Sequence, residues 1–176
     1  MTGRAAGGGT DVLGDVADDE LHARLRSCCA ADAWVQWILA GRPYGSEAAL
    51  LAASDRATAG LDADGLAQAL AGHPRIGERA AAHHDGHSAA WSRSEQAGVT
   101  AAGDDVLGEL AAANAAYEER FGHVYLVCAS GRSAAELLAV CRARIGNDPQ
   151  TERGVVLEEL AKINQLRLIK LLEVQG

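Results

Sequence analysis

Apolar residues recur every three to four positions over most of this chain, a spacing that places them on one face of a helix. Leu21 and Leu25 share such a face near the start, and Leu160 and Ile163 share another near the end. The pattern and its polar breaks predict helices over residues 17–30, 33–39, 48–58, 65–70, from 92 onward, 104–121, 134–145 and from 149 almost to the C-terminus.

Capping residues mark several of the predicted helix starts. Ser133 with Glu136 three positions later has the form of a capping box, in which the serine oxygen accepts from a free amide and the glutamate reaches back. Ser92 with Glu95 has the same form, so we expect a short helix to begin at Ser92. Asp148 directly precedes a proline and predicts a further N-cap, because proline fits the first position of a helix.

Two stretches do not fit the helical pattern. Residues 75–91 are polar and rich in alanine, glycine and histidine, and we interpret them as a loop with at most one weak helix. Residues 123–129 read HVYLVCA and fit either a strand or buried extended chain, although a lone strand has no partner here. We therefore expect an all-α fold, a single compact helical bundle of about eight helices. The expected organisation is a flexible glycine-rich tail over residues 1–14 and one domain over residues 15–176.

The composition agrees with a helical fold. Of the 176 residues, 48% are hydrophobic but only 4% are aromatic, and alanine and leucine, which favour helices, dominate the apolar fraction. A chain of this length is typical of a single domain, so we expect one well-packed core.

Charge and hydropathy argue against nucleic acid and membrane as partners. The 16 basic and 24 acidic residues give a formal charge of −8, with no basic run that could follow a phosphate backbone. No apolar stretch approaches the roughly 20 residues of a membrane helix, and the polar N-terminus lacks a signal-peptide core. We therefore expect a soluble cytoplasmic protein. Cysteines 28, 29, 128 and 141 have no disulfide or CxxC spacing and are expected to be reduced and mostly buried.

Histidines gather between His83 and His87, where the chain reads HHDGH. Imidazoles three and four positions apart on a helix can share a metal ion, but Gly86 and the weak local helix pattern argue against that geometry. A solvated loop is the favoured interpretation, and no metal site is expected. The alternative function is a non-catalytic helical scaffold or metal-buffering protein that uses this cluster.

Three further residues are candidates for chemistry, although each also has a structural interpretation. His73 precedes Pro74 at the expected end of a helix, where its ring can point into a cleft. Glu95 fits a helix cap, and Arg167 lies on an otherwise apolar helix, where an arginine needs a partner or a route to solvent. No single residue decides between the two interpretations.

Several blocks of the sequence together resemble the 2-oxo-4-hydroxy-4-carboxy-5-ureidoimidazoline (OHCU) decarboxylases. Residues 72–79 read GHPRIGER, and residues 91–99 read WSRSEQAGV. Further blocks follow in the family's order: FG at 121–122, ASGRS at 129–133, RIGND at 144–148 and LRL at 166–168. The resemblance covers residues 15–174 and implies an all-α fold, no cofactor and commonly a homodimer.

The resemblance also implies the residues of a site. The family's catalytic histidine falls on His73, and its Ser-x-x-Glu-Gln motif falls on Ser92, Glu95 and Gln96. Tyr125 stands where members often carry phenylalanine, which leaves the details of the pocket open. The expected catalytic residues are His73 and Glu95, and the expected substrate-binding residues are Pro74, Ser92, Gln96, Arg167, Val127 and Ala129.

The family's chemistry gives each residue an expected role. Its substrate carries a hydroxyl and a carboxylate on one ring carbon beside a carbon–nitrogen double bond, which can accept the electrons left by carbon dioxide without a cofactor. His73 would carry the proton, since histidine exchanges protons near neutral pH. Glu95 would accept from the hydroxyl or orient the ureido group. Arg167 would contact a ring oxygen, because gripping the departing carboxylate would stabilise the ground state. The implied product is (S)-allantoin; action on a related ureido or hydantoin compound remains open.

Overall fold

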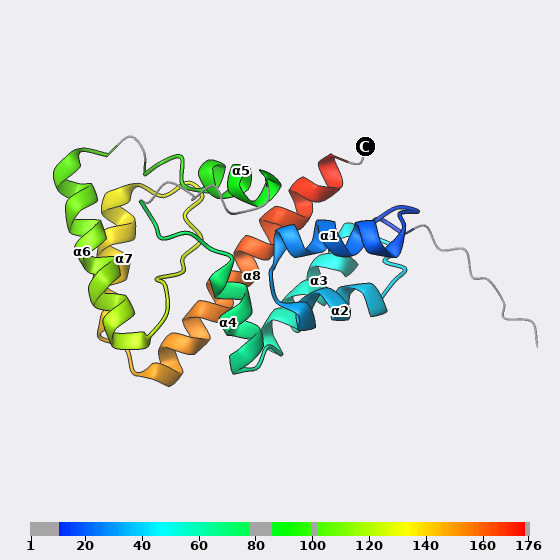
Figure 1. The fold of residues 1–176 in the computed structure, drawn as a ribbon, viewed down its shortest axis with the longest axis horizontal. Coiled ribbons are helices and arrows are strands. Elements are labelled where there is room, and N and C mark those ends of the chain that lie inside the picture. Colours follow the sequence, from blue (N-terminus) through cyan, green and yellow to red (C-terminus); the bar gives the residue numbers. More distant parts are fainter. Residues whose placement is uncertain (1–10, 78–85, 100–101, 175–176) are drawn as a thin grey trace, which may run out of the picture.

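The computed structural model describes residues 11–77, 86–99 and 102–174, with the side chains of residues 86–89 excepted. Helices account for all the regular secondary structure of these residues, which confirms the predicted all-α fold (Figure 1). The helices are α1 Asp18–Cys28, α2 Asp32–Ala40, α3 Glu47–Ala59, α4 Ala63–Ala71, α5 Gly86–Glu95, α6 Asp104–Phe121, α7 Ala134–Ile145 and α8 Pro149–Glu173.

Helix α8 is the longest element, at 25 residues, and it runs obliquely through the molecule (Figure 1). Helices α1 and α3 pack against it, and α2 and α4 complete this group. On the other side, α6 and α7 pack against each other. Helix α5 lies beside α1, above the path of α8, so that residues distant in sequence approach one another there.

The apolar side chains form two clusters, where the sequence predicted one core. The first is built from α1–α4 and α8 around Trp34, Leu50 and Leu160. The second is built from α6 and α7 around Leu110 and Leu137. The buried apolar residues of α8 all pack in the first cluster, and the segment before α7 contributes side chains to both clusters.

The two clusters meet along residues 124–129, within the stretch 123–129 that fits either a strand or buried extended chain. This segment is non-helical and pairs with no strand in the described parts of the chain. Leu126 packs in the first cluster, whereas Tyr125, Val127 and Ala129 pack in the second. Alternate residues thus face opposite sides, as in an extended chain. The segment is buried extended chain rather than a strand.

Most of the predicted helix starts are confirmed. Ser133 and Glu136 form the full capping box, with the Ser133 amide donating to the Glu136 carboxylate at 2.7 Å. Asp148 caps α8 by accepting from the amides of Gln150 and Thr151, both at 3.0 Å. These local signals fix where α7 and α8 begin.

The helix predicted to begin at Ser92 is wrong, because Ser92 and Glu95 lie in the last turn of α5. Residues 86–91 are helical, so the stretch 75–91, interpreted as a loop with at most one weak helix, does contain the start of a helix. The i, i+3 spacing of a capping box also places two side chains on one face of a helix. Both side chains bind Arg167 there instead of the helix's own amides.

The packed part of the chain begins at residue 11, inside the stretch 1–14 that was expected to be a flexible tail. Leu13 is fully buried. The Asp11 carboxylate accepts from the Leu13 and Tyr44 amides and pairs with Arg42 at 2.6 Å. Residues 11–14 thus belong to the folded body.

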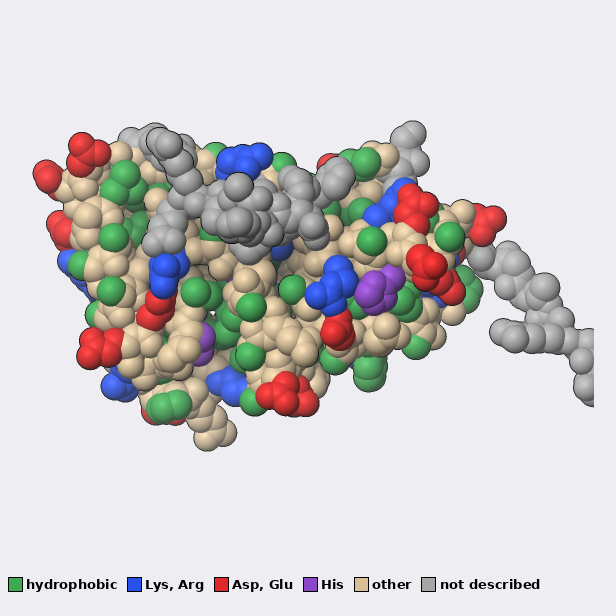
Figure 2. Space-filling model, in the orientation of Figure 1, with side chains coloured by type: hydrophobic (Ala, Val, Ile, Leu, Met, Phe, Trp, Pro, Cys, Tyr) green, Lys and Arg blue, Asp and Glu red, His purple; other side chains and the backbone are tan. Residues whose placement is uncertain are grey.

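The surface carries charges of both signs. On the face in Figure 2, acidic and basic side chains lie interspersed, without a basic stripe. Among the described helices, none has the length and apolarity required to cross a bilayer.

Candidate active site

His73 lies in the turn that follows α4. Asp62 caps the start of α4, and the helix ends at Ala71 with Gly72 as its C-cap. Pro74 disfavours helical backbone in His73, the residue before it, so the helix does not continue. The His73 ring is 9% exposed, and its Nδ1 lies 2.9 Å from the Ala69 carbonyl oxygen. A carbonyl can only accept, so Nδ1 carries the hydrogen. Nε2 is then the ring atom through which His73 can exchange a proton with a ligand.

Glu95 and Arg167 form a buried two-pronged ion pair. Arg167 Nε donates to Glu95 Oε1 at 2.9 Å, and Nη2 donates to Oε2 at 3.0 Å. The residues are 8% and 2% exposed, so water screens the pair very little. Paired guanidinium and carboxylate satisfy each other's charge, and removal of either leaves a buried charge without compensation.

Three elements bring this pair together. Glu95 and Ser92 share a face at the end of α5, and Arg167 lies on the buried face of α8, one helical turn after Ile163. Arg167 also donates to Ser92 Oγ and to the carbonyl of Cys28, at the end of α1, both at 3.3 Å. The guanidinium therefore joins α1, α5 and α8.

Gln96 is engaged with the turn after His73. Its Oε1 accepts from the Gly77 amide at 2.9 Å, and its Nε2 lies 3.5 Å from the Arg75 carbonyl. Asn114 on α6 donates to the Ile76 carbonyl at 2.8 Å, so two side chains hold this turn. Gln96 thus has a structural task in addition to its place in the cleft.

These residues line one cleft where the two apolar clusters meet. Its free volume is about 20 Å³, enough for a single water, so the side chains must move apart to admit a ring-sized ligand. Its walls include all eight residues singled out in the sequence, together with four others. The lining is His73, Pro74, Ile76, Ser92, Glu95, Gln96, Tyr125, Leu126, Val127, Ala129, Ile163 and Arg167.

Sequence reasoning missed three of the apolar walls, Ile76, Leu126 and Ile163. Ile163 lies four positions before Arg167, so helical periodicity places both on one face of α8. Leu126 directly precedes Val127, and Ile76 follows Pro74 by two positions. Proximity to those residues was the available signal.

The segment between the clusters carries two backbone N–H groups without an acceptor among the described residues, and both belong to residues that line the cleft. Val127 and Ala129 are 2% and 4% exposed. Within the described parts of the chain, no group accepts a hydrogen bond from either backbone N–H. Buried amides without an acceptor are costly, so these two are suited to bind a ligand.

A larger cavity of about 550 Å³ lies elsewhere, between α4 and the start of α8. Its walls are mainly apolar, with Leu66, Leu70 and Val124 among them, and it shares no residue with the small cleft. General acid–base chemistry needs titratable side chains at the site. The small cleft is lined by His73, Glu95 and Arg167 together, which makes it the candidate active site.

The described residues offer neither a metal site nor a reactive thiol at the cleft. Within the described ranges, no three histidine, cysteine or acidic side chains are grouped to hold a metal ion. Residues 83–85 of the histidine cluster, and the side chain of His87, lie outside the described residues. The cysteines are free and mostly buried, as predicted. Burial raises the pKa of Cys28 to about 12 and that of Cys29 to about 11, so neither is a nucleophile at neutral pH.

Two curated proteins are similar to this chain. The uric acid degradation bifunctional protein TTL of Arabidopsis thaliana is 30% identical over 158 residues, which are 89% of this chain and 48% of that protein. The 2-oxo-4-hydroxy-4-carboxy-5-ureidoimidazoline decarboxylase of Amia calva is 33% identical over 142 residues, 80% of this chain and 79% of that protein. The chain thus spans about half the length of the first relative and most of the second.

The fold is also similar to a solved structure. The crystal structure of an OHCU decarboxylase in the presence of (S)-allantoin superposes with a TM-score of 0.74 at 25% identity, over 90% of this chain and 99% of that one. The profile of the OHCU decarboxylase family matches residues 15–169. Since this match covers nearly the whole described body, the chain belongs to the OHCU decarboxylase family.

Proposed function

We propose that this protein decarboxylates 2-oxo-4-hydroxy-4-carboxy-5-ureidoimidazoline to (S)-allantoin in urate degradation, by general acid–base catalysis and without a cofactor. One observation carries the proposal: His73 and the Glu95–Arg167 pair line one cleft in a chain of the OHCU decarboxylase family. The resemblance supplies the substrate, and the geometry supplies groups suited to its chemistry.

The reaction needs positioning and proton transfer. When the bond to the carboxylate breaks, its electron pair forms a carbon–carbon double bond within the ring, and the imine pair moves onto nitrogen, which takes up a proton. The hydroxyl then loses a proton to become a carbonyl, and the neighbouring carbon gains one. The substrate is its own electron sink, so the protein has to orient the ring and move protons.

His73 is the proposed proton carrier. The bond from Nδ1 to Ala69 fixes the ring's orientation and its tautomer, which leaves Nε2 to accept the hydroxyl proton or return one to carbon. Delivery from one side gives a single enantiomer.

Glu95 is proposed to accept from the substrate's hydroxyl or ureido group. Each of its oxygens accepts one bond from Arg167 and retains a further lone pair for a ligand.

Arg167 is proposed to position Glu95 and to contact a ring oxygen. A guanidinium has five N–H groups. Four of them are directed to Glu95, Ser92 and Cys28 in the described structure, which leaves one Nη1 hydrogen for the substrate. Backbone amides of Val127 and Ala129 are the proposed additional donors.

An assay with a chelator separates this function from the metal-buffering alternative. Freshly generated imidazoline is mixed with the protein, with and without EDTA, and its disappearance is followed. Equal acceleration in both arms is expected. Activity that EDTA abolishes and zinc restores would contradict a cofactor-free reaction, and tight zinc binding without any acceleration would favour the alternative built on His83–His87.

We further propose a homodimer in the cytoplasm, with a small molecule rather than nucleic acid or membrane as partner. The dimer rests on the family resemblance, and the interspersed charges in Figure 2 support the exclusion of nucleic acid. Light scattering tests the dimer, since it should report twice the 18.2 kDa of one chain. Cell fractionation tests the compartment.

A further inference from the structure

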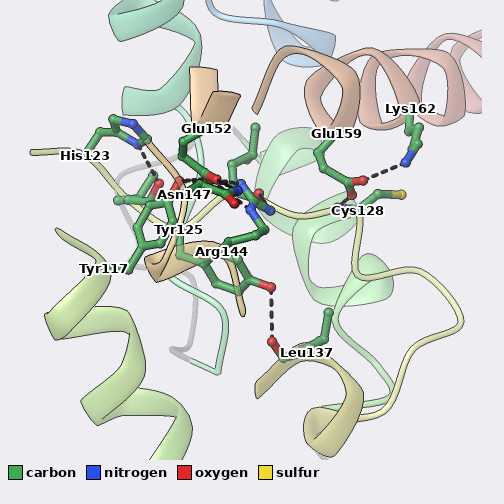
Figure 3. A network of polar contacts seen from close by, with 12 residues as sticks. Tyr117, His123, Tyr125, Cys128, Leu137, Arg144, Asn147, Glu152, Glu159 and Lys162 are labelled. Atoms are coloured by element: carbon green, nitrogen blue, oxygen red, sulfur yellow. Dashed lines mark hydrogen bonds and ion pairs between the residues drawn. The ribbon is translucent and has the colours of Figure 1, made fainter. Parts of the chain in front are cut away.

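The extended segment that lines the cleft is held by two charged side chains rather than by a neighbouring strand (Figure 3). Arg144, in the last turn of α7, donates through Nη1 to the Leu126 carbonyl at 2.8 Å. Glu159, on α8, accepts from the Cys128 amide at 2.8 Å. Both residues are almost completely buried, and neither lines the cleft.

Arg144 is itself fixed in place. Its Nε and Nη2 donate to Glu152 Oε1 at 2.9 and 2.6 Å. Glu152 is fully buried and also accepts from the Tyr117 hydroxyl and from Asn147. The guanidinium lies 5.0 Å from the centre of the Tyr125 ring, on the segment it holds. Arg144 can therefore shift only if this whole network shifts.

Glu159 is held as an anion. Burial raises the pKa of its carboxyl, but the hydrogen bonds from Lys162 and the Cys128 amide lower that pKa by more. Lys162 Nζ lies 2.6 Å from Oε1, and the other oxygen binds the Cys128 amide. An ionised acceptor binds an amide more strongly than a neutral one does.

The geometry of the peptide bond connects these contacts to the cleft. In a trans peptide, the Leu126 carbonyl and the Val127 N–H point in opposite directions. The Val127 N–H consequently points away from Arg144, and it belongs to a residue of the cleft wall. A carbonyl that accepts from a buried cation also polarises its own peptide unit, which makes the N–H on the other side a stronger donor.

We propose that Arg144 and Glu159 are positioning residues for the reaction: they hold the segment from behind, so that the Val127 N–H is aimed at an oxygen of the bound ring. This inference rests on the proposed function. It deepens that function, because it assigns a role to two residues that contact neither the ligand nor the cleft.

Glu159 offers the cleaner test. Glu159→Ala removes the acceptor of the Cys128 amide, whereas Glu159→Gln retains an oxygen for it. Thr58→Val is a stability control, since it removes a buried bond to Asn164 that does not involve the segment.

The measurements are kcat and KM with fresh imidazoline, the melting temperature, and the ¹⁵N–¹H signal of Val127 on addition of (S)-allantoin. We expect Glu159→Ala to lower kcat by about ten-fold or more with little change in KM, because a misplaced donor weakens transition-state contacts. The Val127 signal should no longer respond to allantoin. Glu159→Gln should recover most of both properties, and Thr58→Val should retain them.

Arg144 is tested in two ways, because a single truncation would leave Glu152 buried without its partner. Arg144→Lys preserves a positive charge, but one ammonium cannot serve both Glu152 and the Leu126 carbonyl. The double replacement Arg144→Met with Glu152→Met removes both charges together. Each folded variant should lose the Val127 response and show the same fall in kcat.

The outcomes separate this inference from the proposed function. If Glu159→Ala melts lower, as Thr58→Val does, yet keeps its kcat and its Val127 response, the positioning role is overturned. If the wild-type protein does not act on the imidazoline, the proposed function fails. The Val127 response to allantoin in the variants still decides the inference in that case, because it does not depend on turnover.

Discussion

The guanidinium of Arg167 binds three elements at once, and its planar shape makes this possible. Two parallel donors match the two oxygens of Glu95, while the remaining edges reach Ser92 and the Cys28 carbonyl. A compact ammonium could satisfy only part of this set. The role of Arg167 therefore depends on the planar shape of its guanidinium as well as on its charge.

Arg167→Lys should lower kcat/KM by about ten-fold or more and reduce the melting temperature, because the buried carboxylate loses one of its two parallel donors. Steady-state kinetics and thermal melts on the same preparation measure both effects. Arg153→Lys is the matched control, since Arg153 also lies on α8 but donates to Leu61 outside the cleft. If Arg167→Lys has the kinetics of the wild type, the proposed role of Arg167 in the site is wrong.

Glu95→Gln distinguishes the ion pair from the helix-cap interpretation. The amide leaves the charge of Arg167 buried without compensation, so we expect a loss of roughly 3–5 kcal/mol in unfolding free energy and a large fall in activity. A helix cap predicts a loss of about 1 kcal/mol and unchanged kinetics. Urea unfolding and initial rates measured on one sample decide between the two interpretations. A loss of only about 1 kcal/mol with unchanged kinetics would contradict the role assigned to Glu95.

At the scale of elements, the helices were largely predictable and their tertiary contacts were not. Seven of the helices begin within two residues of the predicted positions, because caps such as Ser46, Asp62 and Asp148 act locally. Helix α5 was misplaced because Ser92 and Glu95 have the spacing of a cap but find their partner 72 to 75 residues away. No local pattern encodes that separation.

The residues of the candidate site were predictable, but their pairing was not. The resemblance named eight residues, and all eight line the cleft. Neither the pairing of Glu95 with Arg167 nor the network behind Val127 followed from the sequence, because each joins helices whose relative placement depends on the whole fold. The division of the apolar side chains into two clusters was missed for the same reason.

Ser46→Ala tests whether losing the N-cap of α3 destabilises the protein without affecting the cleft. Ser46 Oγ accepts from the Ala49 amide at 3.2 Å, and α3 contributes no residue to the cleft. Loss of this cap should cost about 1 kcal/mol of unfolding free energy and leave kcat and KM unchanged. Urea denaturation and steady-state kinetics measure the two quantities. A change in KM would show that α3 and the cleft are coupled.

At the scale of the whole molecule, ion pairs join parts of the chain that are distant in sequence. Asp11 pairs with Arg42, and Glu118 pairs with Arg75, next to the turn that carries His73. The hydrogen bond from Arg75 lowers the pKa of Glu118. Burial raises the pKa of Asp11, but Arg42 and two backbone amides lower it by more. Both carboxylates are therefore easier to ionise in the folded protein than in the unfolded chain.

The sign of the pH dependence follows from these shifts. A carboxyl whose pKa is lowered by folding stabilises the protein above its unfolded-state pKa of about 4, and that contribution is lost as the pH falls through the folded-state value. Melting temperature should accordingly fall with pH below about 4. Glu118→Gln should make the fall less steep. Melts across the acid range test this, and stability that rises on acidification would contradict the assignment.

The most direct test of the central claim is the chirality of allantoin formed from fresh imidazoline, followed by circular dichroism with wild-type protein and with His73→Asn. Asparagine can keep a hydrogen bond near Ala69 but cannot carry the proton. We expect rapid formation of (S)-allantoin by the wild type and a fall of roughly 100-fold or more in the variant, with the fold retained. A folded His73→Asn protein that produces (S)-allantoin at the wild-type rate would contradict the claim.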